Sequence, residues 1–129
     1  MIGVDTIEHI QTLCEGGNLD NVDLKIKDMY AGNSALAGNM TAANFGKLSD
    51  MASNGDIALS IINMVFETAA MLGIFAARSK NLRDIVLTGN LTSIPQAKPI
   101  FEDLQKIFDV NFIIPEHAQF ATAIGAALA

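Results

Sequence analysis

The sequence predicts an α/β domain built around a parallel strand–helix–strand unit. An apolar run over 85–88 stops at Gly89-Asn90, and a second apolar run covers 110–114, with a helical pattern between the two. Parallel strands that are covered on both faces have continuous apolar runs of this kind. We therefore expect the 85–88 strand to be central in its sheet and the crossover to be right-handed.

Length and composition indicate one domain with a face for a partner. The chain has 129 residues, of which half are hydrophobic and 17% are charged. A solvated monomer of this size needs fewer apolar side chains, so we expect some of them to face a partner. The net charge of −6, with lysines scattered along the chain, argues against a nucleic-acid groove or an anionic membrane surface, because both need clustered basic residues.

A single cysteine and the shortness of the apolar runs favour a cytoplasmic protein without a membrane span. Cys14 alone excludes an internal disulfide and a cysteine-based zinc site, and with no leading signal sequence it fits a cytoplasmic protein. On an apolar helix face, its thiol is more typical of packing than of a nucleophile. No uninterrupted apolar run reaches the roughly 18 residues of a membrane span; the longest candidate is broken by Asn63, Glu67 and Thr68.

The first thirty residues predict one helix and one ambiguous segment. Asp5 and Thr6 precede apolar residues at helical spacing, so a helix begins there and ends at Gly16-Gly17. The segment 22–27 alternates apolar and polar residues, which predicts a half-buried strand. An apolar stripe that continues to Tyr30 also fits one face of a helix, so both interpretations stay open.

Residues 31–46 are predicted to form a loop followed by a helix start. The segment 31–39 is rich in Gly, Asn, Ser and Ala, which is typical of a loop. Asn39 or Thr41 is expected to cap a helix that begins at 42–45. The small polar segment 41–46 suits the lining of a pocket as well as a helix cap, and its residues alone do not choose between the two.

Three helices are predicted in the second half of the chain. The longest covers 55–78 and is apolar all round, which indicates burial against a sheet and against another subunit. The next begins near Ile94-Pro95 and turns three apolar residues inward: Ile100, Leu104 and Phe108. The last has small residues at every fourth position, which predicts tight packing on the sheet: Ala121, Gly125 and Ala129.

The turn Gly89-Asn90 is the first candidate binding site. It lies at the carboxyl end of a predicted parallel strand, which is where α/β proteins hold nucleotides. Glycine lets the backbone turn close to a ligand. An ordinary left-handed turn explains the same two residues, and by themselves they favour that simpler interpretation.

The two histidines are weaker candidates for a functional site. Glu116-His117 follows a strand and precedes a helix, so the pair could act as an acid or base, or could complement the helix dipole and cap a loop. His9 is predicted to be an exposed helix residue. The chain has no Gly-rich phosphate loop, no serine nucleophile elbow, no HExxH motif and no evident acidic pair for metal-bound phosphates. A complete kinase or hydrolase site is therefore absent.

Four blocks, in order, resemble the C-terminal half of the type II, eukaryotic-like pantothenate kinases. The blocks are 22–30, 42–46, 85–90 and 116–126, and together they extend over nearly the whole chain. These kinases belong to the actin, sugar-kinase and Hsp70 superfamily. The resemblance implies that residues 1–129 form a ribonuclease-H-like (actin-like ATPase) C-terminal lobe, with a short mixed or parallel sheet covered by helices.

The resemblance also implies substrates and site residues. The family phosphorylates pantothenate with Mg-ATP, the first step towards coenzyme A, in a cytosolic homodimer. Gly89 and Asn90 match the turn that meets the nucleotide, and Thr6 or Ile7 lies near a position that packs on it. The segment 108–112 is similar to a region that reaches the partner's pantothenate site, but its aromatic pattern departs from the family's. The N-terminal lobe, with the phosphate loop, the catalytic Glu and most magnesium contacts, has no counterpart in these residues.

These expectations define three hypotheses. The first is the nucleotide-binding and dimerisation lobe of a pantothenate kinase, inactive by itself because phosphoryl transfer needs metal ligands and a base. The second is a non-catalytic regulatory or scaffold protein that binds an adenine nucleotide or an acyl-coenzyme A. The third is a lobe of a related metabolite kinase, since the superfamily changes substrate on one fold.

Overall fold

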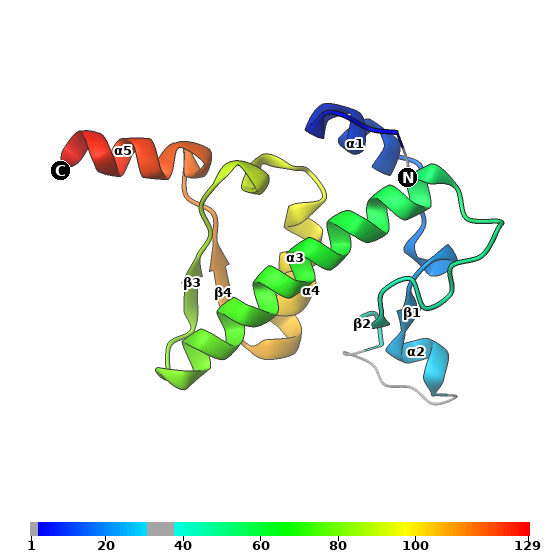
Figure 1. Cartoon of the computed structure of the whole chain (residues 1–129). Coiled ribbons are helices and arrows are strands. Elements are labelled where there is room, and N and C mark those ends of the chain that lie inside the picture. The colour runs from blue at the N-terminus through cyan, green and yellow to red at the C-terminus, as the bar shows by residue number, and fades with distance from the viewer. Residues whose placement is uncertain (1–2, 31–37) are drawn as a thin grey trace. The chain divides into compact units, whose positions relative to one another are not determined.

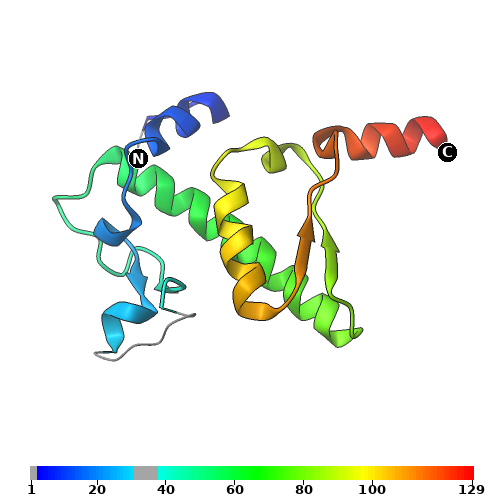
Figure 2. The ribbon, with the colours of Figure 1, turned by 180° about the vertical axis from the view of Figure 1, so that it is seen from behind.

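A computed structural model describes residues 3–30 and 38–129, which divide into two compact units, 1–65 and 66–129. Figures 1 and 2 show the elements from the front and from behind. Each unit is described by itself. Most of the predicted loop 31–39 lies outside the described residues.

The first unit begins with helix α1, Ile7–Cys14. The Thr6 hydroxyl accepts a hydrogen bond from the His9 N–H at 3.2 Å, which satisfies a free donor at the helix start. The helix ends before Gly16-Gly17, as predicted, and the 3-10 turn η1, Leu19–Asn21, follows. Cys14 is buried, and burial raises the pKa of its thiol, which confirms a packing role over a nucleophilic one.

A small antiparallel sheet follows and corrects two predictions. Strand β1, Leu24–Lys25, pairs with β2, Thr41–Ala43, and one turn of helix, α2 (Ile26–Met29), follows β1 directly. The predicted strand 22–27 therefore holds only in part, because Asp28 accepts the Lys25 N–H at 2.8 Å and starts a helical turn. The predicted helix start after Asn39 or Thr41 is wrong, because pairing with β1 draws 41–43 into a strand.

Helix α3, Asn54–Ser79, runs through both units and confirms the predicted long helix. The Ser53 hydroxyl accepts the Asp56 N–H at 3.1 Å, and the Asp56 carboxylate accepts the Ser53 N–H at 2.9 Å, a reciprocal cap. By length and composition alone α3 could cross a membrane. Core helices of soluble proteins have the same property, and this one buries Asp56, Ser60 and Asn63, each hydrogen-bonded within the first unit.

The second unit contains the predicted parallel strand–helix–strand. Strands β3, Asp84–Val86, and β4, Asn111–Ile113, pair in parallel, and helix α4, Ala97–Phe108, connects them (Figure 2). Ile85 and Phe112 are opposite each other and half-buried. In the described residues this sheet has two strands, and its other face exposes Val86 (60%) and Ile113 (43%). The expectation of a central strand covered on both faces is therefore wrong here.

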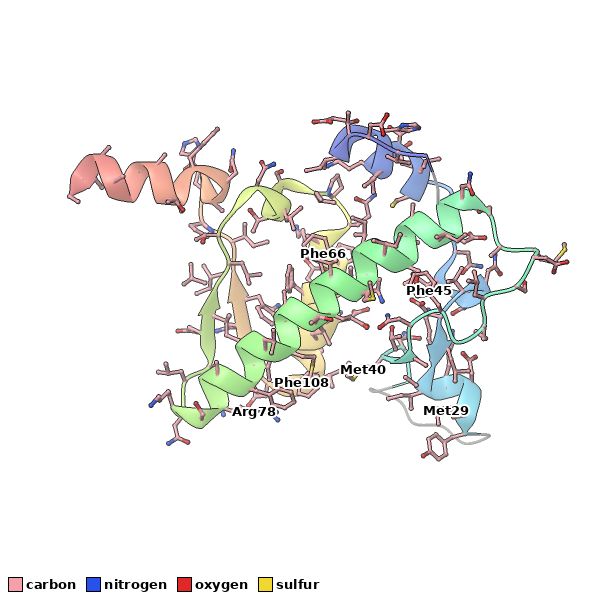
Figure 3. The ribbon with its side chains drawn as sticks, viewed as in Figure 1. Met29, Met40, Phe45, Phe66, Arg78 and Phe108 are labelled. Carbon is pink, nitrogen blue, oxygen red and sulfur yellow. The ribbon has the colours of Figure 1, made fainter. Side chains whose placement is uncertain are left out.

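Helix α3 is held in the second unit by apolar side chains. Phe66, Ala70, Ile74 and Ala77 are buried, and a Cβ at Gly73 would lie 3.3 Å from Ile85, so this helix packs closely on the sheet. At its end, the Arg78 guanidinium donates to the Phe108 carbonyl at 3.0 Å and lies over the Phe108 ring, 5.2 Å from its centroid (Figure 3).

Helix α4 starts later than predicted and turns a different face inward. The 3-10 turn η2, Asn90–Ser93, precedes it, and it begins at Ala97 instead of near Pro95. Its buried residues are Ala97, Phe101 and Leu104, whereas the predicted Ile100 and Phe108 are half-buried. Leu104 is the one prediction of the three that is confirmed.

The last helix corrects another prediction. The 3-10 turn η3, Ala118–Phe120, leads into α5, Ala121–Leu128, which has no buried residue. A Cβ at Gly125 would meet no atom within 4 Å, so the small residues do not pack tightly on the sheet. Alanine and glycine offer little apolar area, and burying them against the sheet would gain little free energy.

Candidate functional site

The predicted turn lies at the carboxyl ends of both parallel strands. The ladder continues past β3, where the Leu87 N–H donates to the Ile113 carbonyl at 2.9 Å. The Gly89 N–H then donates to the Ala118 carbonyl, also at 2.9 Å, which ties the turn to η3 after β4. Ligands of open α/β sheets bind at this edge. The turn therefore has the position expected of a nucleotide site.

Glycine is required at position 89 by the backbone. Gly89 has φ 106° and ψ 166°, a conformation that residues with a Cβ rarely adopt. A Cβ there would meet no atom within 4 Å, so space in front of the residue is open. The Gly89 carbonyl accepts from the Thr92 hydroxyl at 2.7 Å. The turn is thus held by hydrogen bonds and leaves open space in front of Gly89.

Asn90 is exposed beside Gly89. Its carbonyl accepts from the Ser93 hydroxyl at 2.7 Å, whereas its side-chain amide makes no hydrogen bond to the part of the chain that the structure describes. An exposed amide of this kind is free to donate to or accept from a ligand.

A cleft of about 670 Å³ lies beside the turn, within the usual size range of small-molecule sites. Its floor holds two aromatic rings, Phe101 and Phe112, with centroids 4.9 Å apart. The Gln105 side-chain oxygen, Oε1, accepts the Phe112 N–H at 2.5 Å, which fixes α4 against β4. The cleft is lined by Thr92, Ser93, Ile94, Pro95, Lys98, Phe101, Glu102, Gln105, Phe112 and Ile114.

Sequence reasoning missed this cleft. Its floor joins Phe101 of α4 to Phe112 of β4, and that contact depends on how helix and strand pack. The one signal in the sequence was the apolar spacing of Ala97, Phe101 and Leu104, which marks the inward face of α4.

Thr6 and Ile7 belong to the first unit, so the structure describes them apart from Gly89 and Asn90. Thr6 caps α1 with its hydroxyl, and the Ile7 side chain is 38% exposed. Both are available on the surface of that unit.

Glu116 and His117 form an exposed pair and not a built acid–base site. The His117 Nε2 lies 3.5 Å from the Glu116 carboxylate, with both side chains mostly in solvent. His117 is the N-cap residue of η3, as predicted, with a left-handed backbone, φ 60°, although its side chain makes no cap hydrogen bond. The exposed position predicted for His9 is confirmed.

The segment 44–46 forms a turn that packs inside the first unit, so the predicted helix cap there is wrong. The Phe45 N–H donates to the Asp23 carboxylate at 2.9 Å, and Asp23 also accepts from the Ser60 hydroxyl at 2.6 Å. Asp23 is fully buried. Sequence reasoning missed this buried carboxylate, which joins three separate segments of the first unit.

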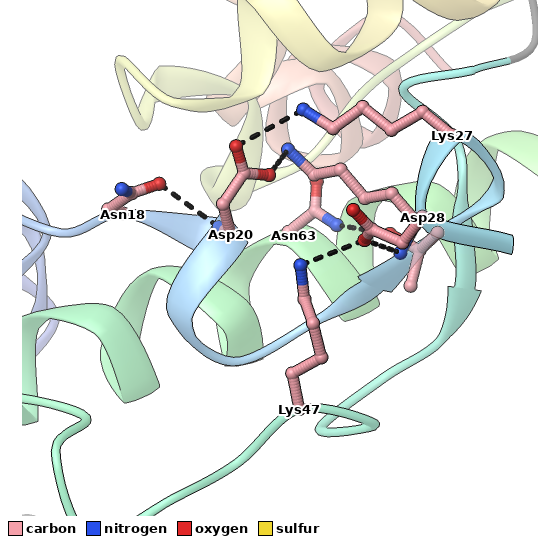
Figure 4. Close-up of polar contacts among 8 residues, drawn as sticks. Asn18, Asp20, Lys27, Asp28, Lys47 and Asn63 are labelled. Carbon is pink, nitrogen blue, oxygen red and sulfur yellow. Dashed lines mark hydrogen bonds and ion pairs between the residues drawn. The ribbon is translucent and has the colours of Figure 1, made fainter. Parts of the chain in front are cut away.

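Three lysines that were expected to be scattered gather on the first unit (Figure 4). Lys25 and Lys27 both pair with Asp20, and Lys47 pairs with Asp28 at 2.8 Å. Hydrogen bonds from Lys25 and from Lys47 lower the pKa values of the Asp20 and Asp28 carboxyls, respectively. Each ammonium has a carboxylate partner, so the cluster presents no unpaired basic patch.

Among the described residues, no group of three or more His, Cys, Asp and Glu side chains could hold a metal ion.

Comparison with known proteins identifies relatives over the whole chain. A model of the Fumble family matches residues 1–129. Type II pantothenate kinases from Staphylococcus saprophyticus and Bacillus cereus are 26% and 28% identical to it, over 98% and 99% of this chain. A third, from Staphylococcus haemolyticus, is 27% identical over 92%. These matches confirm the resemblance to type II pantothenate kinases. The chain spans about half the length of these relatives, 47% to 50%.

Proposed function

The chain belongs to the Fumble family, and from that premise we propose that it is the nucleotide-binding, C-terminal lobe of a type II pantothenate kinase. Two features support this assignment within the family. The chain spans about half of its relatives' length, and its sequence contains no Gly-rich phosphate loop. The open turn at Gly89-Asn90, at the carboxyl ends of a parallel strand pair, carries the proposal.

In this proposal the lobe positions ATP and supplies no catalytic group. Gly89 brings its backbone close to the nucleotide, and the Asn90 amide hydrogen-bonds to it. Thr6 and Ile7, at the start of α1, are proposed as further nucleotide-binding residues, as the family resemblance implies. Phosphoryl transfer to pantothenate needs charge stabilisation by metal-bound groups and a base. These are assigned to the other lobe of the kinase.

The proposal predicts binding without catalysis for the 129-residue chain. Titration calorimetry should detect ATP binding, and Asn90→Ala should weaken it roughly five- to tenfold through the loss of one hydrogen bond. Gln119→Ala, a matched exposed amide in η3, should leave the affinity unchanged. A coupled assay should find no phosphorylation of pantothenate. Turnover by this chain at ordinary enzyme rates, or no ATP binding, would refute the proposal.

We also propose that the chain self-associates in the cytoplasm. The second unit exposes large apolar side chains on its sheet and on α3, including Val86, Leu72 and Phe75. Extended apolar patches on a soluble surface mark interaction sites. Sedimentation velocity should show a dimer or larger species at high concentration. A single monomeric species across the concentration range would contradict this part of the proposal.

A further inference from the structure

Gly89 lies at the centre of the candidate site, and it has no side chain to hold it in place. Glycine has more backbone freedom than any other residue, and fixing a residue in one conformation has an entropic cost. Gly89 nevertheless has the defined angles φ 106° and ψ 166°. Neighbouring groups must therefore hold its backbone, and those groups decide how the turn faces a ligand.

Hydrogen bonds hold Gly89 on both sides of its α-carbon. Its N–H donates to the carbonyl of buried Ala118 at 2.9 Å, which restrains φ. Its carbonyl accepts from the Thr92 hydroxyl at 2.7 Å and from the Thr92 N–H at 3.2 Å, which restrains ψ. The hydroxyl bond has the usual length for its type, whereas the N–H bond is at the long end of its range. The Thr92 side chain is therefore the stronger restraint on the Gly89 carbonyl.

The direction of that carbonyl sets the direction of the next N–H. A trans peptide group is planar, with its oxygen and its hydrogen on opposite sides. Because the Gly89 carbonyl is turned towards Thr92, the Asn90 N–H points away from Thr92, and no hydrogen bond within residues 3–30 and 38–129 uses it. Thr92 thus fixes the peptide group that presents Asn90 at the site.

The hydroxyl contact of Thr92 is common in type but unusual in what it holds. Ser79 makes the same contact with the carbonyl three residues before it, that of Ala76, at 2.7 Å, but at the exposed end of α3. Thr92 is half-buried, and its β-branched side chain has few rotamers to lose when the hydroxyl binds. What distinguishes Thr92 is that its hydroxyl holds the glycine of the candidate site.

We propose that Thr92 is a positioning residue for the nucleotide: its hydroxyl holds the Gly89 carbonyl and so keeps the Gly89-Asn90 turn in the conformation that binds ATP. The inference rests on the proposed function, since it names a residue that acts through the same turn. Thr92 acts without contacting the ligand. A turn that is ordered before binding loses less conformational entropy when ATP binds, so the affinity is higher.

Titration calorimetry with ATP tests this role. Thr92→Val keeps the shape of the side chain and the backbone N–H bond and removes the hydroxyl, so the ATP affinity should fall roughly five- to tenfold. Thr92→Ser restores the hydroxyl and should bind ATP within about twofold of the unmodified chain. Ser79→Ala is the matched control, because it removes the same contact at the end of α3. It should leave the ATP affinity unchanged.

A coupling measurement separates positioning from direct contact with the ligand. If Thr92 acts through the turn, Thr92→Val should weaken ATP binding by only about twofold or less in an Asn90→Ala background, because the two changes then remove one shared effect. In the unliganded chain, Thr92→Val should also shift the Asn90 amide signal, since that peptide group includes the Gly89 carbonyl. Equal weakening of ATP binding in both backgrounds would overturn the positioning role.

The outcomes distinguish the role of Thr92 from the proposed function. Circular dichroism first establishes that each variant is folded, and Thr92→Ala, which also lacks the hydroxyl, replaces Thr92→Val if that variant unfolds. If the unmodified chain binds ATP and the folded variant binds it equally well, the positioning role is wrong and the proposed function stands. If the unmodified chain binds no ATP, both proposals fail.

Discussion

Both halves of α3 bury apolar side chains, among them Ala58 and Ile62 in the first unit, but among the described residues the first half buries polar ones as well. In the first unit its buried polar side chains, Asp56, Ser60 and Asn63, each hydrogen-bond to a separate segment of the chain. In the second unit it packs through apolar residues such as Phe66 and Ile74. Hydrogen bonds specify partners and register, whereas apolar burial supplies most of the free energy of folding. We infer that the first unit is sensitive to pH and polar substitution, and the second to lost volume.

The largest effect is expected from emptying the core of the second unit. Phe101 is 5% exposed and contacts two other rings. Phe101→Ala should lower the free energy of unfolding by about 3–5 kcal/mol through lost burial and a cavity. Denaturant unfolding measures this, with Phe120→Ala, at a ring 57% exposed in the same unit, as the control. Equal losses for the two variants would contradict the apolar account of this unit.

The next largest effect is expected from removing the buried Asp56 carboxylate of the first unit. The Asp56 carboxylate accepts hydrogen bonds from the Ser53 N–H, the Asn18 N–H and the Asn21 amide. Asp56→Ala should cost about 2–3 kcal/mol of unfolding free energy, since hydrogen bonds to a charged group are strong. Asp50→Asn, an exposed carboxylate nearby, should change little. Thermal unfolding followed by circular dichroism compares the two variants.

The same carboxylate predicts a pH dependence. The Ser53 and Asn18 backbone N–H groups and the Asn21 side chain lower the pKa of Asp56 from 3.8 to about 2. Because the folded pKa lies below the unfolded one, the ionised carboxyl stabilises the fold above pH 3.8, and this contribution is lost as the pH falls towards 2. Asp56→Asn should reduce the pH dependence of the unfolding free energy between pH 3.8 and about 2. An unchanged pH profile in this variant would contradict the assignment.

A smaller effect is expected at Ser60. Its hydroxyl donates to buried Asp23 at 2.6 Å, and the second Asp23 oxygen has no hydrogen-bond partner within the described ranges. Ser60→Ala should cost about 1–3 kcal/mol, because a buried carboxylate loses a donor. Ser79→Ala, on the same helix with an exposed hydroxyl, is the control. The midpoint of urea unfolding distinguishes the two variants. Identical midpoints would show that the Ser60–Asp23 hydrogen bond stabilises the fold no more than an exposed one.

The smallest effect is expected at an exposed ion pair. Arg83 and Asp109 are 3.0 Å apart, but their side chains are 73% and 79% exposed. Asp109→Asn should change the unfolding free energy by less than about 0.5 kcal/mol, because solvent screens the pair and asparagine tolerates the left-handed backbone there. A loss above about 1 kcal/mol by chemical denaturation would show that this pair contributes more than its exposure implies.

The sequence predicted correctly the elements that depend on a long run of apolar residues or on a contact between near neighbours in the chain. The apolar composition of α3 continues along its 26 residues, and Thr6 caps α1 three residues before the amide it binds. The parallel pair also followed from two apolar runs joined by a helix.

Contacts between distant residues account for the errors. Leu24 and Lys25 form a strand because they pair with β2, and the Ile26 and Lys27 N–H groups extend this contact to the carbonyls of Met40 and Gly38. Nothing local to 22–27 indicates those partners. The same holds for the site: the Gly89-Asn90 turn was visible in the sequence, whereas the cleft beside it required Phe101 and Phe112 to meet.

Amide chemical shifts test most directly whether the Gly89-Asn90 turn of this Fumble-family chain binds an adenine nucleotide. When ATP is titrated into the isotope-labelled chain, the Gly89 and Asn90 amide signals should shift and reach a plateau as the site saturates. The signals of exposed α5 should not shift. Unchanged Gly89 and Asn90 signals at millimolar ATP would contradict the claim.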